Sequence, residues 1–330
     1  MLTLPPDEML SGWLIQPQRA PSGNLSPSSD ILAPLRHVQL KVAGAPQRED
    51  NNTLLSLVRM ETGTLWHTHF ERIFKRRRLP VMLEVRLNDY LPEGWAGIAD
   101  WIMWSDEYKA FVLGDLKTAK PEGMLRLRQY GIKEAHMWQL SAYWYALEKM
   151  GLPLLTSFLC MYLPLEDGVQ GVDSPLVIEG RPLDRAQVIG GMEQRTEDVK
   201  RYLASVARRR EAAMNQSPSP AHNDPWFYLT DELAPVQDRV QKASWVGAKF
   251  HYEVKLAPHW SATYCPYPTE LCDCSTQKEN KIGQWEVTAD GELRYVARKG
   301  YETVEPVELS AGQLRKMKEE IGRARSNANE

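Results

Sequence analysis

The residues of this chain best suited to chemistry are two aspartates and a lysine. Asp100 follows the sequence GIA at 97–99, and Asp115 and Lys117 follow the apolar run FVL at 111–113. Carboxylates are hard oxygen ligands that suit Mg²⁺ or Mn²⁺. A lysine beside them can hold or deprotonate a water molecule and offset negative charge in a transition state. These residue types indicate metal-dependent hydrolysis of a phosphodiester.

The elements expected around these residues are short strands. Alternate side chains of a strand share a face, so Asp115 and Lys117 point the same way and Leu116 points into the core. The Leu116 carbonyl lies at the edge of the site, where it can face a metal. Asp100, expected on a neighbouring strand, can bring a second carboxylate close. The alternative is an exposed ion pair between Asp115 and Lys117, because a lone D-x-K triplet is common by chance.

The apolar spacing predicts alternating helices and strands. Helices are predicted over 54–78, 125–150 and 185–214, and strands over 81–87, 97–104, 110–116 and 154–163. This order predicts an α/β core in which helices pack on a mixed central β-sheet.

Composition shifts predict four regions. An N-terminal extension covers 1–53 and is partly flexible, because residues 16–29 are rich in Pro, Ser and Gly. The core covers 54–214. A linker at 215–225, NQSPSPAHNDP, leads to a mixed C-terminal region at 226–330 that contains the clustered cysteines.

The bulk composition excludes several classes of protein. The 330 residues are 43% hydrophobic and 25% charged, with a net charge of −3, so any nucleic-acid surface must be local. No run approaches the ~20 apolar residues that span a bilayer. The N-terminus lacks the basic and apolar pattern of a signal peptide. We therefore expect a cytoplasmic protein without a membrane partner.

Four motifs together resemble a known nuclease family. GIAD at 97–100, followed by GDLK at 114–117, resembles the PD-(D/E)xK nuclease superfamily. The Q-x-x-x-Y motif at 139–143 and the G-x-x-x-H motif at 63–67 resemble its RecB-like branch. The resemblance covers about a third of the chain and implies a restriction-endonuclease-like core.

The resemblance also implies roles for individual residues. The catalytic residues would be Asp100, Asp115, Lys117, Gln139 and Tyr143. The Mg²⁺ or Mn²⁺ ligands would be His67, Asp100, Asp115 and the Leu116 backbone carbonyl. Glu84 is a further candidate ligand, because related nucleases have an upstream glutamate; the alternative is a solvated strand residue.

The activity that the resemblance implies is metal-dependent cleavage of DNA. We expect an exonuclease that acts on DNA ends in recombination or repair. A phage or prophage that encodes such an enzyme for recombination is a compatible source. Expected partners are DNA and a recombinase, a single-strand-annealing protein or a helicase, and an oligomer is compatible with the sequence. The alternatives are a structure-specific or nicking endonuclease on the same fold, and a catalytically silent DNA-binding scaffold.

Basic residues flank the acidic motifs and are candidates for DNA binding. Arg76 and Arg77 end the predicted helix at 54–78, and Lys120, Arg126 and Arg128 follow the GDLK motif. Contacts from such groups to phosphates give salt-sensitive binding without sequence preference. The alternative for each is a solvated helix face.

Clustered cysteines follow the core. The cluster consists of His259, Cys265, Cys272 and Cys274, and Cys265 lies in a YCP sequence. This pattern is similar to a C-terminal cysteine cluster that helps to hold a [4Fe–4S] cluster in several RecB-like nucleases. Those proteins also use a cysteine before the core, whereas here none precedes Cys160, which is expected to be a buried thiol. A His-Cys₃ zinc site and a group that only packs the tail are the alternatives.

Overall fold

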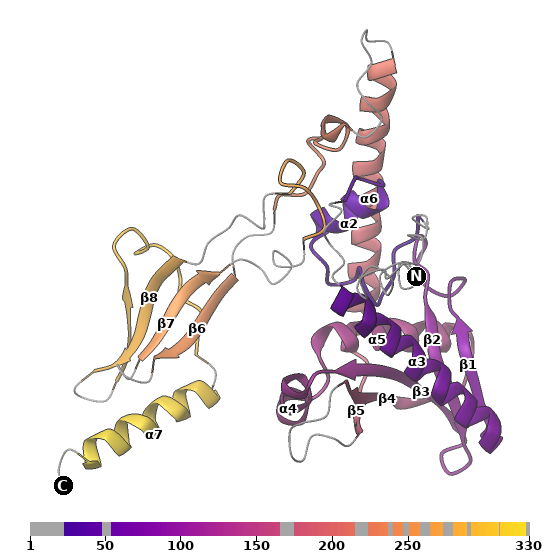
Figure 1. Ribbon diagram of the computed structural model, residues 1–330, viewed down its shortest axis with the longest axis horizontal. Coiled ribbons are helices and arrows are strands. Elements are labelled where there is room, and N and C mark those ends of the chain that lie inside the picture. Colours follow the sequence, from indigo (N-terminus) through magenta and orange to yellow (C-terminus); the bar gives the residue numbers. More distant parts are fainter. Residues whose placement is uncertain are drawn as a thin grey trace, which may run out of the picture. The chain divides into compact units, whose positions relative to one another are not determined.

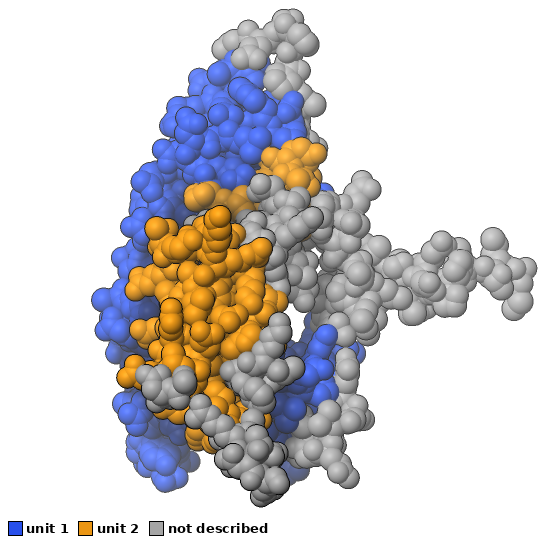
Figure 2. All heavy atoms as spheres, turned by 90° about the vertical axis from the view of Figure 1, so that its left-hand side faces the viewer, with its two compact units in different colours: residues 1–234 blue, residues 235–330 orange. Residues whose placement is uncertain are grey.

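The computed structural model divides the chain into two units, residues 1–234 and 235–330 (Figure 2). The residues it describes are 23–47, 54–165, 175–214, 224–236, 240–246, 251–257, 265–272, 280–288, 292–309 and 311–327. The predicted linker lies largely outside these ranges, since 215–223 are not among them.

The first unit is built on a mixed five-stranded sheet (Figure 1). Its strands, in spatial order, are β1 (Val81–Arg86), β2 (Ile98–Ser105), β3 (Ala110–Ala119), β4 (Leu154–Pro164) and β5 (Leu176–Gly180). The β3–β4 pair is parallel and the other pairs are antiparallel. The prediction of an α/β core with helices on a mixed sheet is confirmed; β5 was not predicted.

Helices cover both faces of this sheet. The helix α3 (Leu54–Arg77) places Phe74 against Trp101 of β2, with 6.1 Å between ring centroids. The helix α5 (Glu134–Lys149) lies on the opposite face, where Gln139 reaches Asp115. The long helix α6 (Arg185–Met214) packs against α5 and against α2 (Leu35–Val42), which the sequence did not predict.

The single helix predicted over 125–150 is wrong. The structure has two helices here, α4 (Pro121–Tyr130) and α5. Gly131 ends α4 with a φ of +79°, a conformation that glycine adopts without strain, and its N–H bonds to the Leu127 carbonyl. The prediction failed because the apolar spacing continues across this break.

The N-terminal segment that the structure describes is fixed to the sheet unit. The Leu25 N–H donates to the Gly94 carbonyl and the Ala96 N–H donates to the Leu25 carbonyl, both at 2.8 Å. Buried Asp30 accepts from the Ser26 N–H and from Lys41 Nζ, each at 2.8 Å. We call residues 23–31 the N-terminal strap. The flexibility predicted for residues 16–29 stays a prediction, and residues 1–22 lie outside the described ranges.

The second unit is an antiparallel sheet with one packed helix. Its strands, in order, are β6 (Val240–Val246), β7 (His251–Ala257), β8 (Asn280–Val287) and β9 (Leu293–Ala297). The helix α7 (Ala311–Asn327) contributes Met317 to a small core with Tyr252 and Leu309. Among the helices that the structure describes, none is long and apolar enough to cross a membrane.

Close packing between β2 and β3 depends on one glycine. A Cβ placed on Gly114 would lie 1.8 Å from the Trp101 ring, so only glycine lets that indole lie flat on β3. This contact keeps the two strands that carry Asp100 and Asp115 in fixed register.

We expect Gly114→Ala to lower the free energy of unfolding by about 1–3 kcal/mol, because overpacking forces Trp101 out of place. Urea denaturation measures this change. The matched control is Gly190→Ala in α6, where a Cβ would meet nothing within 4 Å. Alanine there should raise stability by about 0.5–1 kcal/mol. Equal stability of Gly114→Ala and the parent chain would contradict the packing account.

Candidate active site

Asp115 is the centre of the acidic site. Its side chain on β3 is 1% exposed. Lys117 Nζ lies 3.0 Å from Oδ1 and 2.8 Å from Oδ2, but only the first contact has hydrogen-bond geometry. Gln139 Nε2 on α5 donates to Oδ1 at 3.2 Å. Asp115 and Lys117 therefore share a face, as strand alternation predicted, and they form a partly buried pair, with the Lys117 side chain 22% exposed.

The electrostatics of Asp115 favour a further cation. Burial raises the pKa of Asp115 to about 7, and the charge of Asp100 adds to the rise while Lys117 opposes it. Burial alone would lower the pKa of Lys117, but the charges of Asp115 and Asp100 outweigh it and raise that pKa. The buried Oδ2 of Asp115 accepts no hydrogen bond from any described residue.

Asp100 lies beside this pair on β2. Its Oδ2 accepts a hydrogen bond from the Leu116 N–H at 2.8 Å. His67 Nδ1 on α3 lies 3.6 Å from the same oxygen. The structure thus brings the predicted ligands His67, Asp100 and Asp115 to one end of the sheet, from two strands and a helix.

One cavity gathers most of the predicted metal ligands. It has a volume of about 210 Å³, and His67, Glu84, Asp100 and Leu116 all line it, together with Glu71. We call it the metal-side cavity. Glu84 has a φ of +50° within β1, a conformation that costs a non-glycine residue energy and is found mostly where the surroundings enforce it.

These residues fit a hard divalent cation by their chemistry. Carboxylate oxygens, an imidazole and a backbone carbonyl are suitable donors. Asp115 Oδ2 accepts no hydrogen bond from a described residue, and the Lys117 ammonium, 2.8 Å away, already supplies it with a cation. Among the described residues, no three of these acidic and histidine donors lie within 4.8 Å of one another. Loading an ion therefore requires side-chain movement, with Lys117 giving up part of its contact with Asp115.

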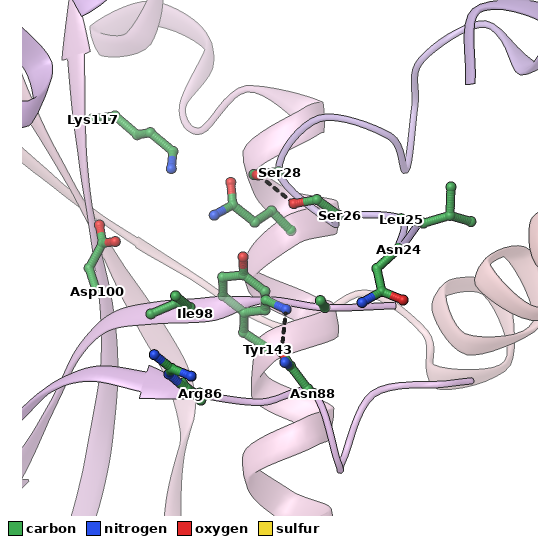
Figure 3. A pocket seen from close by; sticks show the side chains of 13 residues that line it. Asn24, Leu25, Ser26, Ser28, Arg86, Asn88, Ile98, Asp100, Lys117 and Tyr143 are labelled. Carbon is green, nitrogen blue, oxygen red and sulfur yellow. Dashed lines mark hydrogen bonds between the residues drawn. The ribbon is translucent and has the colours of Figure 1, made fainter. Parts of the chain in front are cut away.

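A second, larger cavity shares Asp100 with the first. It has a volume of about 610 Å³, and Asp100, Lys117, Gln139 and Tyr143 all line it (Figure 3). We call it the polar cavity. Gln139 and Tyr143 are both buried on one side of α5, one helical turn apart, as predicted. Burial raises the pKa of Tyr143, so its hydroxyl stays protonated.

The first position of the GIAD motif, Gly97, has a packing reason to be glycine. A Cβ at this position would lie 2.6 Å from Cε1 of Tyr143, so glycine allows the tyrosine ring to rest against β2 at the cavity wall. The Gly97 N–H also donates to Asn88 Oδ1 at 3.1 Å, which holds the turn after β1 against the same wall.

The predicted DNA-binding residues do not line the site. Arg76, Arg77, Lys120, Arg126 and Arg128 are all exposed, and none lines either cavity. Their contact with DNA stays a prediction.

Sequence reasoning missed several residues that do line the cavities. Arg86 at the end of β1 and Asn88 after it line the polar cavity, together with Asn24, Ser26 and Ser28 of the strap. Arg86 stands two positions after Glu84, so strand alternation could have placed both on one face. The strap residues carried no such signal.

The structure describes only two of the four residues of the predicted metal site in the C-terminal region. Cys265 and Cys272 are buried in the second unit, and their sulfur atoms lie within 4.8 Å of each other, so they could supply two ligands to a metal ion. His259 and Cys274 lie outside the described residues. Cys160 is buried in β4 beside Asp115, and burial raises its pKa to about 12, so it stays a thiol.

Comparison with family models, with curated proteins and with solved structures found no match to this chain.

The buried imidazole of His136 affects how the stability of the fold depends on pH. His136 Nδ1 lies 2.8 Å from the Tyr162 hydroxyl, and burial, with the charges of Lys117 and Lys133, lowers the His136 pKa to about 3. The unfolded chain takes up this proton below its ordinary pKa of 6.5, whereas the folded chain does not. His136 should therefore destabilise the fold progressively as pH falls from 6.5 towards 3.

We expect His136→Gln to reduce the loss of unfolding free energy between pH 6.5 and pH 4.5 by an amount on the order of 2 kcal/mol. Urea denaturation at both pH values measures it. His69→Gln is the matched control, because His69 is exposed. An acid dependence that is the same in His136→Gln and the parent chain would contradict the buried neutral state of His136.

Proposed function

We propose that this protein is a metal-dependent nuclease that hydrolyses phosphodiester bonds of DNA, on a restriction-endonuclease-like core with a RecB-like PD-(D/E)xK site. One observation carries the proposal. The buried carboxylate of Asp115 has an oxygen that accepts no hydrogen bond from a described residue, with Lys117 Nζ 2.8 Å away. The carboxylate of Asp100, which lines two cavities, acts on the same group. A purely structural ion pair has no need of that unsatisfied oxygen or of Asp100.

The proposed ligands of Mg²⁺ or Mn²⁺ are His67, Asp100, Asp115 and the Leu116 carbonyl, with Glu84 beside them in the metal-side cavity. When bound, the ion would polarise the scissile phosphate, help to generate hydroxide and stabilise the leaving oxygen. The high pKa of Asp115 means that a proton competes with the ion near neutral pH. Metal binding should therefore strengthen as pH rises towards and through 7, and level off above it.

The other residues act on the water and on the substrate. Lys117 stays charged beside Asp115, so it can hold the attacking water and offset charge that builds on the phosphate. Gln139 fixes Oδ1 of Asp115, which leaves Oδ2 for other contacts. Tyr143, as a protonated hydroxyl on the polar cavity, can donate to a phosphate or sugar oxygen.

An exonuclease is the form of this activity that we propose first, acting on DNA ends in recombination or repair. The strap supports it, because residues 24–28 form a wall of the polar cavity and are held to the sheet unit by backbone hydrogen bonds. A fixed wall beside Asp115 and Lys117 suits a DNA strand whose end lies in the polar cavity. A nicking endonuclease and a silent DNA-binding scaffold are the alternative outcomes of the test.

The test compares matched linear and covalently closed DNA, each with Mg²⁺, Mn²⁺ or EDTA. We expect metal-dependent loss of the linear form alone. Lys117→Met should lower the rate by at least about 10²-fold, because it removes a charge that stabilises the transition state. Asp115→Asn should do the same while thermal unfolding stays cooperative.

Lys149→Met is the matched control, because Lys149 is exposed at the end of α5. It should cleave at the parental rate. Cleavage of both DNA forms would replace the exonuclease with an endonuclease. DNA binding without cleavage in either metal would favour the scaffold, and parental rates in both site variants would remove the assignment of the site.

A further inference from the structure

The polar cavity has a lining that the cleavage chemistry does not use. Only Asp100, Lys117, Gln139 and Tyr143 belong to the catalytic set. The rest of the wall comes from the strap, from Arg86 at the end of β1, from Asn88 after it and from residues 96–98. Figure 3 shows Asp100 and Lys117 at one end of the cavity and Asn24 and Leu25 at the other, with Tyr143 between them.

The charges of this cavity favour an anion. Among the described residues that line it, Arg86 and Lys117 are cationic and Asp100 is acidic. Arg86 is exposed, and its guanidinium has no ion-pair or hydrogen-bond partner among the described residues. Lys117 is already paired with Asp115. Arg86 is therefore the group that is available to bind a phosphate, with the bidentate geometry that guanidinium offers.

The neutral polar groups lie where a sugar and a base could sit. Ser26 and Ser28 share a hydrogen bond at 2.8 Å between their hydroxyls, and each hydroxyl can still accept or donate further. Asn24 and Asn88 bring side-chain amides to the same cavity, and the side-chain Oδ1 of Asn88 accepts a hydrogen bond from the Gly97 N–H. Hydroxyls and amides of this kind recognise sugar hydroxyls and base edges.

Size and rigidity limit the ligand. A volume of about 610 Å³ lies within the range of small-molecule sites and is too small for a length of duplex. The strap that closes the cavity is held by the Leu25 backbone bonds and by the Asp30–Lys41 ion pair at 2.8 Å. The site is therefore preformed for one nucleotide unit.

We propose that the polar cavity is a subsite for a single nucleoside monophosphate, the terminal nucleotide of a strand or the product released from it. Arg86 binds its phosphate, and the strap and Asn88 contact its sugar and base. The identification of the ligand as a terminal nucleotide rests on the proposed nuclease function, whereas binding of the free nucleotide does not depend on cleavage.

The experiment titrates the full-length protein in EDTA with each of the four deoxynucleoside 5′-monophosphates, with a deoxynucleoside and with inorganic phosphate, by isothermal titration calorimetry. We expect saturable binding of at least one monophosphate and much weaker binding of the two fragments. Arg86→Ala should raise the Kd by about tenfold or more, because it removes a charge-assisted hydrogen bond. The double variant Ser26→Ala/Ser28→Ala should raise it severalfold.

Arg126→Ala is the matched control, because Arg126 is exposed on α4 and lines neither cavity. It should leave the Kd unchanged. Binding of phosphate as tight as that of every monophosphate, no saturable binding of any monophosphate, or an equal effect of Arg86→Ala and Arg126→Ala would each overturn the subsite. Nucleotide binding without any DNA cleavage would support the nucleotide subsite and contradict the proposed nuclease activity. Cleavage without nucleotide binding would support the nuclease activity and contradict the subsite.

Discussion

The burial of the Asp115 carboxylate is the constraint on which the rest of this site depends. Removing such a group from water is expensive, and a single ion pair with Lys117 does not recover the whole penalty. The pKa of Asp115, raised to about 7, reflects that deficit. A protein that keeps this arrangement needs strands that cannot slip and a partner for the unsatisfied oxygen. Gly114, Gln139 and the proposed divalent cation meet those needs.

Asp100 connects the two halves of the site. It lines both cavities, so the metal-side cavity with His67 and Glu84 and the polar cavity with Arg86 meet at one carboxylate. The two cavities draw on both layers of helices and on the strap, which explains why segments far apart in sequence converge here. In the account proposed above, cleavage takes place where the cavities meet and the polar cavity holds the nucleotide beyond the scissile bond.

Much of the fold could be predicted because short apolar runs bounded by turn residues define β1 to β4, and their order defines a mixed sheet. The positions of Asp100, Asp115 and Lys117 followed from strand alternation. The break at Gly131 was missed because apolar spacing continues across it. The strap was missed for a different reason: its Ser-rich composition is typical of a linker. The contacts that hold it, which include the backbone hydrogen bonds to residues 94–96 and the Asp30–Lys41 ion pair, leave no local pattern in the sequence.

The most direct test of the central claim is a crystal structure grown with Mn²⁺, with diffraction data collected at the manganese absorption edge. Anomalous scattering locates the ion independently of any assumption about the site. We expect a manganese peak beside Asp100, which lines the metal-side cavity, with the ion bonded to Asp100 and, once Lys117 is displaced from Oδ2, to Asp115. An ordered site without such a peak, in which the Asp115–Lys117 pair is unchanged at saturating Mn²⁺, would contradict it.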